Sequence, residues 1–311
     1  MLKIYKTNVD GQTFEIDGIE NGCWVSLTNP NETELEYVSQ KTGLLIEFLR
    51  APLDEEESSR IEIDGDQTSV IIDIPVMDVK DKSLQYYTIP LGIVLNDKFI
   101  VTICLKENKV IDDFVAKKVK SFYTFKKSRF ILQILYKVAS YYLCYLKQID
   151  KTSHIIEARL HKSMKNKELI QLLSLEKSLV YFSTSLKSNE ITLEKMLKLE
   201  MMQKYPEDQD VLEEVIIENK QAIEMANIYS NILSGTMDAF ASIISNNLNI
   251  VMKFLASITI VLSIPTMVSG LFGMNVPVPF GDNPFGFYLV LLIIAIMSGG
   301  VTYLLAKKDM F

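Results

Sequence analysis

The stretch GLFGMNVPVPFGDNPFGF, residues 270–287, lies between the two most apolar segments of the chain. Residues 254–281 contain no charged side chain, and neither do residues 283–306. Each segment is longer than the roughly 20 apolar residues with which a helix crosses the hydrocarbon core of a bilayer. The sequence therefore predicts two transmembrane helices near the C-terminus, with this Gly- and Pro-rich stretch connecting them.

The charged residues around these two segments predict their orientation. Lys253 precedes the first helix, Lys307 and Lys308 follow the second, and the loop between them carries only Asp282. Lysines collect on the cytoplasmic side of a membrane, and the first residues of the chain lack a signal-peptide pattern. We expect a multi-pass protein of an inner or plasma membrane, with both termini in the cytoplasm.

The composition argues against several classes of protein. A net charge of −7 over 311 residues does not suit a nucleic-acid partner. The three cysteines form no C-x-x-C pair, which is typical of a reducing compartment and argues against a disulfide scaffold or a thiolate zinc site. No hydrolase, P-loop or dinucleotide-binding motif occurs, so we expect neither an enzyme nor a nucleotide-driven pump.

Before the predicted membrane helices, the sequence pattern changes from β-rich to helical. The first part has two pairs of β-rich runs around polar turns, SRIEIDGDQTSVIIDIPV and YYTIPLGIVLNDKFIVTICL, and a short helix that ends before Gly43. Residues 129–202 are helical with a break at 162–168, and a Tyr-Pro pair follows. We expect an α+β domain, in which a small sheet is flanked by helices, followed by a long helical hairpin.

A further helix is predicted to continue from the cytosol into the first membrane segment. Apolar residues recur on one face at about 3.5-residue spacing, without a proline before Pro265. A helix of about 60 residues does not bury such a face alone, so we expect a homo-oligomer with this helix along the axis. The stripe consists of Leu212, Val215, Ile216, Asn219, Ile223, Ala226, Tyr229, Leu233, Met237, Phe240, Ile244 and Leu248.

These patterns divide the chain into seven segments, from the cytosolic part to the tail. They are a cytosolic α+β domain at 1–120, the hairpin at 121–206, the cytosolic part of the stalk helix at 207–250, a pore-lining transmembrane helix at 251–273, an external loop at 274–284, a second transmembrane helix at 285–306 and a basic cytosolic tail at 307–311.

The triplet Gly-Met-Asn within GLFGMN carries a resemblance to a known family. It stands at the outer end of the first predicted span, which SNNLNIVMKFL leads into, and a second span and the terminal AKKDMF follow. In this layout the chain resembles the CorA family of divalent-cation transport proteins, closely from residue 208 onward and in general pattern before residue 120. The resemblance implies a homopentameric channel with a funnel-shaped cytosolic part.

The chemistry of the triplet agrees with a role at the entrance for the ion. Mg²⁺ holds its water tightly, so neutral amide oxygens that accept hydrogen bonds from the bound water suit its passage. Asn275 provides the amide next to Met274, and Gly273 lets the backbone turn or pack closely at the helix end. The C-terminal carbonyls of the span add partial negative charge at the same mouth.

Small and polar residues on the same helix are the candidate pore lining. In an alternative interpretation, the hydroxyl groups of Ser263 and Thr266 only satisfy the backbone or pack between helices, and Asp238 is an exposed acid without a role in the pore. Near the membrane, a ring of carboxylates on the axis would attract cations that leave the pore. The candidates are Thr266, Ser263, Met252, Asn249 and Asp238.

The resemblance also suggests a regulatory metal site. Glu214 falls where family members place an acidic residue that binds Mg²⁺ between subunits, and Glu213 lies beside it. The opposing acids would come from EIDGD, which offers Asp64 and Asp66. Cytosolic Mg²⁺ would then hold the pore shut. Without the resemblance, the two glutamates would be interpreted as a solvated helix face.

Three interpretations of function remain open. The first is a channel for passive uptake of Mg²⁺ with no cofactor besides transported and regulatory Mg²⁺, whose partners are copies of itself, the lipid bilayer and divalent ions. The second is a relative that moves Zn²⁺ or Co²⁺/Ni²⁺, because Asp282 is the only acid in a loop that is often acidic in the family. The third is a membrane-anchored sensor or scaffold that conducts nothing.

Overall fold

A computed structural model describes residues 1–8, 11–80, 83–163, 166–203, 205–276, 278–279, 284–308 and 310. The chain divides into two compact units, Met1–Gly235 and Thr236–Phe311. Each unit is described by itself.

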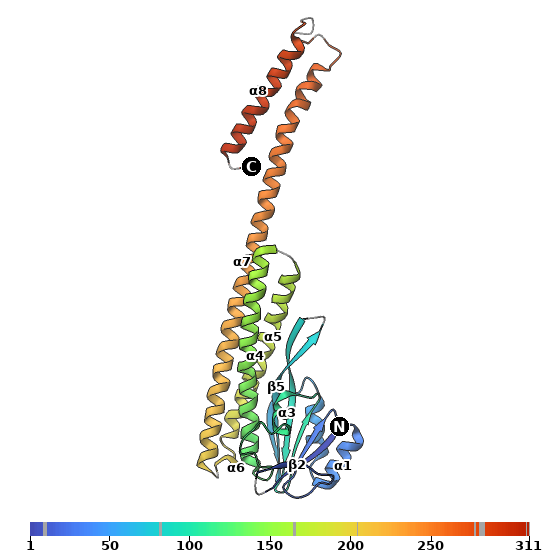
Figure 1. The fold of residues 1–311 in the computed structure, drawn as a ribbon, viewed down its shortest axis with the longest axis vertical. Helices are drawn as coiled ribbons and strands as arrows, with labels where there is room; N and C mark the ends of the chain where they lie inside the picture. Colours follow the sequence, from blue (N-terminus) through green and yellow to red (C-terminus); the bar gives the residue numbers. More distant parts are fainter. Residues whose placement is uncertain are drawn as a thin grey trace. The chain divides into compact units, whose positions relative to one another are not determined.

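The first unit is built on a seven-stranded sheet with the order β2-β1-β3-β7-β6-β5-β4 (Figure 1). Neighbouring strands are antiparallel except β3 and β7, which run parallel. Both predicted hairpins are confirmed, because Asp64 pairs with Gln67 and Leu95 pairs with Ile100 across their turns. The strands are β1 (Leu2–Thr7), β2 (Thr13–Glu15), β3 (Trp24–Thr28), β4 (Arg60–Asp64), β5 (Gln67–Lys80), β6 (Ser83–Leu95) and β7 (Ile100–Cys104).

Two short helices, α1 (Glu32–Thr42) and α2 (Ile46–Arg50), cover one face of the sheet, followed by the 3₁₀ turn η1 (Ala51–Leu53). The Asn31 side chain caps α1 by accepting a hydrogen bond from the Glu34 N–H. Gly43 ends the helix with φ 73°, a left-handed conformation that glycine adopts without strain, as predicted. Apolar side chains of both helices and of the central strands form a common core.

The opposite face is covered by the short α3 (Lys109–Val115) and by two long helices, α4 (Lys127–Ser163) and α5 (Asn166–Met196) (Figure 1). Trp24 is fully buried there, and its Nε1–H donates to the Thr102 hydroxyl at 2.8 Å. The ring of Trp24 packs edge-on against Phe114, Phe122 and Phe130. This cluster fixes the start of α4 on the sheet.

The predicted helical hairpin is confirmed in α4 and α5. One helix ends at Ser163 and the next begins at Asn166, inside the predicted break at 162–168. After the short α6 (Glu200–Gln203), α7 (Pro206–Phe272) begins at its proline, where the missing N–H needs no partner. α7 is one helix of 67 residues, close to the length expected from the sequence.

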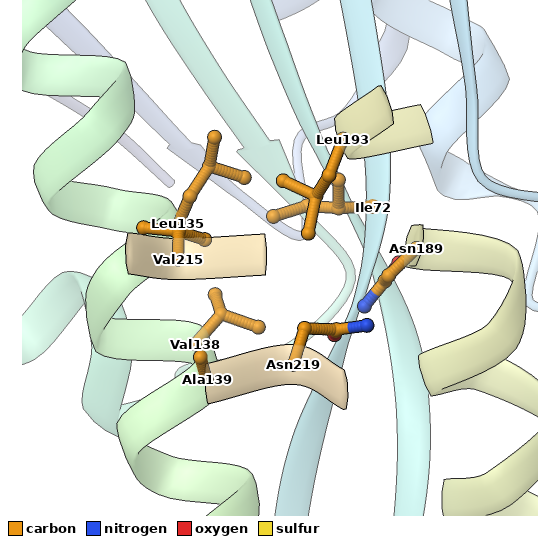
Figure 2. A pocket seen from close by; sticks show the side chains of 8 residues that line it. All are labelled: Ile72, Leu135, Val138, Ala139, Asn189, Leu193, Val215 and Asn219. Carbon is orange, nitrogen blue, oxygen red and sulfur yellow. The ribbon is translucent and has the colours of Figure 1, made fainter. Parts of the chain in front are cut away.

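Strand β5 and helices α4, α5 and α7 meet around a cavity of about 10 Å³, which is close to the smallest volume that holds one water molecule. Figure 2 shows the two amides of this site, Asn189 from α5 and Asn219 from α7, among aliphatic side chains. The Asn219 Nδ2 donates to the Leu186 carbonyl oxygen at 3.0 Å. A salt bridge of 3.6 Å between Lys220 and Glu190 also joins α7 to α5.

These contacts correct one expectation about the apolar stripe of α7. The expectation that the whole stripe contacts other chains is wrong for its first part. The α4–α5 hairpin of the same chain lies alongside and buries these side chains (Figure 1). The buried members in the first unit are Leu212, Val215, Ile216, Asn219, Ala226 and Leu233.

The second unit contains the end of α7 and α8 (Gly286–Lys307), which form an antiparallel pair (Figure 1). Both helices have a window that is long and apolar enough to cross a membrane, with mean hydropathy 1.9 in α7 and 2.4 in α8. Only 11% of the window in α7 and none of the window in α8 is buried. A core helix of a soluble protein would instead be mostly buried, so these apolar surfaces match lipid or other chains.

Candidate ion pathway

Gly273 forms the transition from α7 to the loop. The helix ends at Phe272, and the Gly273 N–H donates to the Ser269 carbonyl oxygen at 2.9 Å. A Cβ atom at position 273 would lie 3.1 Å from the same oxygen, which is closer than most Cβ contacts. Its backbone is not left-handed, so the close approach, and not a special φ angle, favours glycine here.

Met274 and Asn275 follow directly and are both exposed. The last carbonyl groups of α7 lie immediately before them, and a helix C-terminus carries about half a negative charge. An amide oxygen next to this charge accepts hydrogen bonds without binding a cation as tightly as a carboxylate does. The end of α7 therefore combines the two features expected of an entrance for a hydrated cation.

The five candidate pore-lining residues are also exposed in the single chain. At 100° per residue, the spacings between them place them within an arc of about 100° on α7. They therefore share one face of the helix, which nothing in the described part of its own chain covers. They are Asp238, Asn249, Met252, Ser263 and Thr266.

The two hydroxyl groups on this face are hydrogen-bonded to their own helix. Ser263 Oγ donates to the Ile260 carbonyl oxygen at 2.7 Å, and Thr266 Oγ1 donates to the Leu262 carbonyl oxygen at 3.2 Å. A hydroxyl that donates to the backbone keeps lone pairs that accept hydrogen bonds from water. These contacts thus satisfy the backbone and leave acceptors on the exposed face, and the role of these residues in a pore stays a prediction.

Pro265 lies between them inside α7, and the helix continues through it to Phe272. Proline has no N–H to donate to the Val261 carbonyl four residues earlier. The Val261 carbonyl oxygen therefore lacks its usual hydrogen bond within the helix.

The four candidate regulatory acids lie on different elements of the first unit. Glu213 and Glu214 are exposed on α7, between the buried Leu212 and Val215. Asp64 ends β4, and Asp66 lies in the following turn, also exposed. In the described residues, no three His, Cys, Asp or Glu side chains are arranged to hold a metal ion. The remaining predicted site residue, Asp282, lies outside the described residues.

One contact in the second unit was not expected from the sequence. Ser257 on α7 is fully buried, and its hydroxyl lies 2.9 Å from the carbonyl oxygen of Met310. Two residues separated by 53 positions in the chain give no local pattern that would reveal such a contact.

Comparisons with known proteins agree with the layout of these helices. A family model described as CorA-like Mg²⁺ transporter protein matches residues 20–308. A cobalt/magnesium transport protein CorA from Methanocaldococcus jannaschii is 26% identical over 295 residues, which cover 92% of this chain and 90% of that protein. The family is one of transporters rather than enzymes, as expected.

Solved structures share the fold. The complete structure of the CorA magnesium transporter from Methanocaldococcus jannaschii has a TM-score of 0.83 at 24% identity and covers 98% of this chain and 96% of its own. The ZntB cytoplasmic domain from Vibrio parahaemolyticus has a TM-score of 0.59 at 11% identity and covers 79% of this chain and 96% of its own. With the family match spanning nearly the whole sequence, the chain belongs to the CorA-like Mg²⁺ transporter family.

Proposed function

We propose that this protein is a homo-oligomeric membrane channel for passive uptake of divalent cations, with Mg²⁺ as its ion. The observation that carries the proposal is the exposed amide of Asn275, held beside the C-terminal end of an apolar helix by the close turn at Gly273. Hydrated Mg²⁺ donates hydrogen bonds through its bound water, and amide and carbonyl oxygens accept them. The assigned family and the relative that carries cobalt and magnesium in its name support the same class of ion.

An oligomer, with five chains as the expected number, provides the pore. A second apolar line on α7 is exposed in the single chain and supports this assembly. Its residues are spaced by 11, 4 and 11 positions, which keeps them within about 80° on a helix. Exposed apolar stripes of this kind pack against partner helices. The line consists of Ile217, Ile228, Ile232 and Ile243.

In this arrangement the triplet faces the outside and both termini face the cytosol. Lys253, Lys307 and Lys308 then flank the spans on the cytosolic side, which follows the positive-inside rule. An inward-negative potential favours entry of a divalent cation by about 4.6 kcal/mol per 100 mV. Asp238, Asn249, Met252, Ser263 and Thr266 line the path from the cytosolic entry toward the triplet.

Cytosolic Mg²⁺ closes the pore by bridging neighbouring chains. The exposure of Glu213 and Glu214, and of Asp64 and Asp66, supports a site that needs acids from two chains. Carboxylates that have lost the ion repel one another and favour separation, so low cytosolic Mg²⁺ opens the pore. In the purified full chain, millimolar Mg²⁺ should protect the first unit from protease, and changing Glu213 and Glu214 together to Ala should blunt this protection. Unaltered protection would count against the site.

The experiment that tests the function is ion flux into vesicles containing the purified protein. Mg²⁺, Co²⁺ and Zn²⁺ are offered separately, with and without an imposed potential and with and without a pH gradient. Mg²⁺ entry that follows the potential and ignores the pH gradient is the expected result. Zn²⁺ entry without Mg²⁺ entry would show that the chain carries a different ion. If none of the three ions enters, the channel proposal fails and the interpretation as a non-conducting sensor or scaffold is favoured.

A further inference from the structure

The second unit has a polar contact at the end of the helix pair opposite to the Gly273 turn. Along α8, Gly286 is the only described residue that is buried, so α8 has little packed surface to fix its position within the chain. A short connection after Phe272 joins α7 to α8 at one end. At the other end, the contact between Ser257 and Met310 joins them again.

The chain reverses direction after α8 to make this contact. The Lys308 and Met310 N–H groups both donate to the Leu305 carbonyl oxygen, at 3.1 and 3.2 Å. Hydrogen bonds of this kind turn the chain back at a helix C-terminus. The turn brings the Met310 carbonyl oxygen to 2.9 Å from Ser257 Oγ on α7.

The chemistry of Ser257 makes this contact specific and reversible. The hydroxyl has one proton and two acceptors, the Met310 carbonyl oxygen and the Lys253 carbonyl oxygen of its own helix at 2.8 Å. When the tail leaves, the hydroxyl still donates to Lys253, so no buried donor is left without a partner. When the tail is present, its Met310 carbonyl oxygen contacts the hydroxyl, and Ser257 is 0% exposed.

Its neighbour Thr259 shows what a hydroxyl of this helix does without the tail. Thr259 Oγ1 donates to the Leu255 carbonyl oxygen at 2.8 Å and remains exposed. The two residues thus share the local hydrogen bond and differ in the contact with the tail.

We propose that Ser257 is a positioning residue that binds the C-terminal tail to α7 and so holds α7 against α8. We call the hydrogen bond between Ser257 and Met310 the latch. The latch closes the helix pair at the end opposite to the triplet. Its effect on conduction rests on the proposed function, whereas the docking of the tail does not.

The docking is tested by limited carboxypeptidase digestion of the full chain in lipid nanodiscs, with release of the last residues followed by mass spectrometry. Loss of one hydrogen bond changes an opening equilibrium by about fivefold, so Ser257→Ala should be digested about fivefold faster. Ser257→Thr keeps the hydroxyl and should stay close to the wild-type rate, as should the matched control Thr259→Ala. A wild-type rate for Ser257→Ala would overturn the latch.

The positioning role is tested by Mg²⁺ flux into proteoliposomes. We expect Ser257→Ala, and a chain stopped after Lys308, to lower the initial rate by about twofold or more. Because both changes remove the same contact, the combined variant should fall no further. Unchanged rates, or fully additive losses, would overturn the role of the latch in conduction. If the wild-type protein moves no ion, the channel proposal fails, and the digestion rates still decide the latch.

Discussion

Asn189 of α5 pairs its side-chain amide with both backbone groups of Asp73 in β5. The Asp73 N–H donates to Asn189 Oδ1 at 2.9 Å, and Asn189 Nδ2 donates to the Asp73 carbonyl oxygen at 2.8 Å. Strand β4 begins at Arg60, which pairs with Ile71, so Asp73 lies just beyond the last residue that β4 covers. The amide continues the hydrogen-bond ladder where the strand is missing, and it fixes the helical hairpin to the sheet.

Replacing Asn189 should therefore destabilise the first unit. Asn189→Ala leaves the Asp73 N–H without its partner, whereas the Asp73 carbonyl oxygen still accepts a hydrogen bond from the Tyr142 hydroxyl at 3.0 Å. We expect a loss of about 1–3 kcal/mol in the free energy of unfolding. Trp24 is the only tryptophan of the chain and is fully buried in this unit, so its fluorescence reports urea unfolding of the purified protein.

The matched control for this prediction is Asn227→Ala. Asn227 is an exposed asparagine of α7 that accepts one hydrogen bond from Ser183 at 2.9 Å. A loss below about 1 kcal/mol is expected there. Equal losses for the two variants would contradict the role of Asn189.

Asp73→Asn should have the opposite effect. Burial raises the pKa of Asp73, and hydrogen bonds from Ser185 and Ser59 offset this only in part. Between the carboxyl pKa of the unfolded chain and the raised pKa of the folded chain, the folded state binds more protons, so stability falls as pH rises. Above that window the charged carboxylate keeps the full penalty of burial.

The amide side chain of the Asp73→Asn variant carries no charge at any pH. The variant should therefore unfold at a higher urea concentration than wild type at pH 8, with the difference vanishing toward about pH 4. Trp24 fluorescence again measures the transition. A variant less stable than wild type at pH 8 would contradict this account.

The contribution of Asp113 to stability should depend on pH in the opposite direction. Burial tends to raise the pKa of this carboxyl group, but hydrogen bonds from Lys137, Tyr141 and Lys118 outweigh it and lower the pKa below its ordinary value. A lowered pKa adds stability above the carboxyl pKa of the unfolded chain, and this stability is lost as pH falls through the folded pKa.

The corresponding variant is Asp113→Asn. It should lower the free energy of unfolding at neutral pH by about 1–3 kcal/mol, and its difference from wild type should shrink in acid. Trp24 fluorescence follows this change as well, because Phe114 beside Asp113 packs against its ring. A difference that grows in acid would show that the ion pairs do not stabilise the fold.

Two glycines of α7 and the following turn offer a matched pair of substitutions. A Cβ atom at Gly273 would lie 3.1 Å from the Ser269 carbonyl oxygen, whereas a Cβ atom at Gly270 would meet nothing within 4 Å apart from the backbone of its own helix. Gly273→Ala should shift the backbone beside Asn275 and lower Mg²⁺ flux about tenfold or more, as small misplacements in a binding site do. Gly270→Ala should retain most of the flux, since alanine favours a helix. Equal flux in both variants would show that the turn does not position Asn275.

The parts of the fold that depend on local patterns follow from the sequence. The two charge-free segments, the turns between β4 and β5 and between β6 and β7, and the left-handed Gly43 all lie where the patterns predict them. Each of these features is determined by residues within a few positions of one another, or by the composition of one uninterrupted run.

Contacts between distant residues could not be predicted in the same way. The periodicity of α7 indicates that one face is buried, but the identity of its cover, the α4–α5 hairpin, depends on the fold. Asn189 and Asp73 are 116 residues apart, and Ser257 and Met310 are 53 apart. For Gly273, the sequence suggested a turn or close packing, and the structure adds the distance of 3.1 Å between a Cβ atom and the Ser269 oxygen.

The most direct test of the channel concerns the Asn275 amide itself. Wild-type protein, Asn275→Ala and the control Val276→Ala are each reconstituted in vesicles, and Mg²⁺ entry is measured under an inward-negative potential. Both side chains are exposed and adjacent, so the control separates loss of the amide from a general disturbance of the turn. Our account predicts entry for wild type and Val276→Ala and a loss of about tenfold or more for Asn275→Ala. Undiminished entry through Asn275→Ala would contradict it.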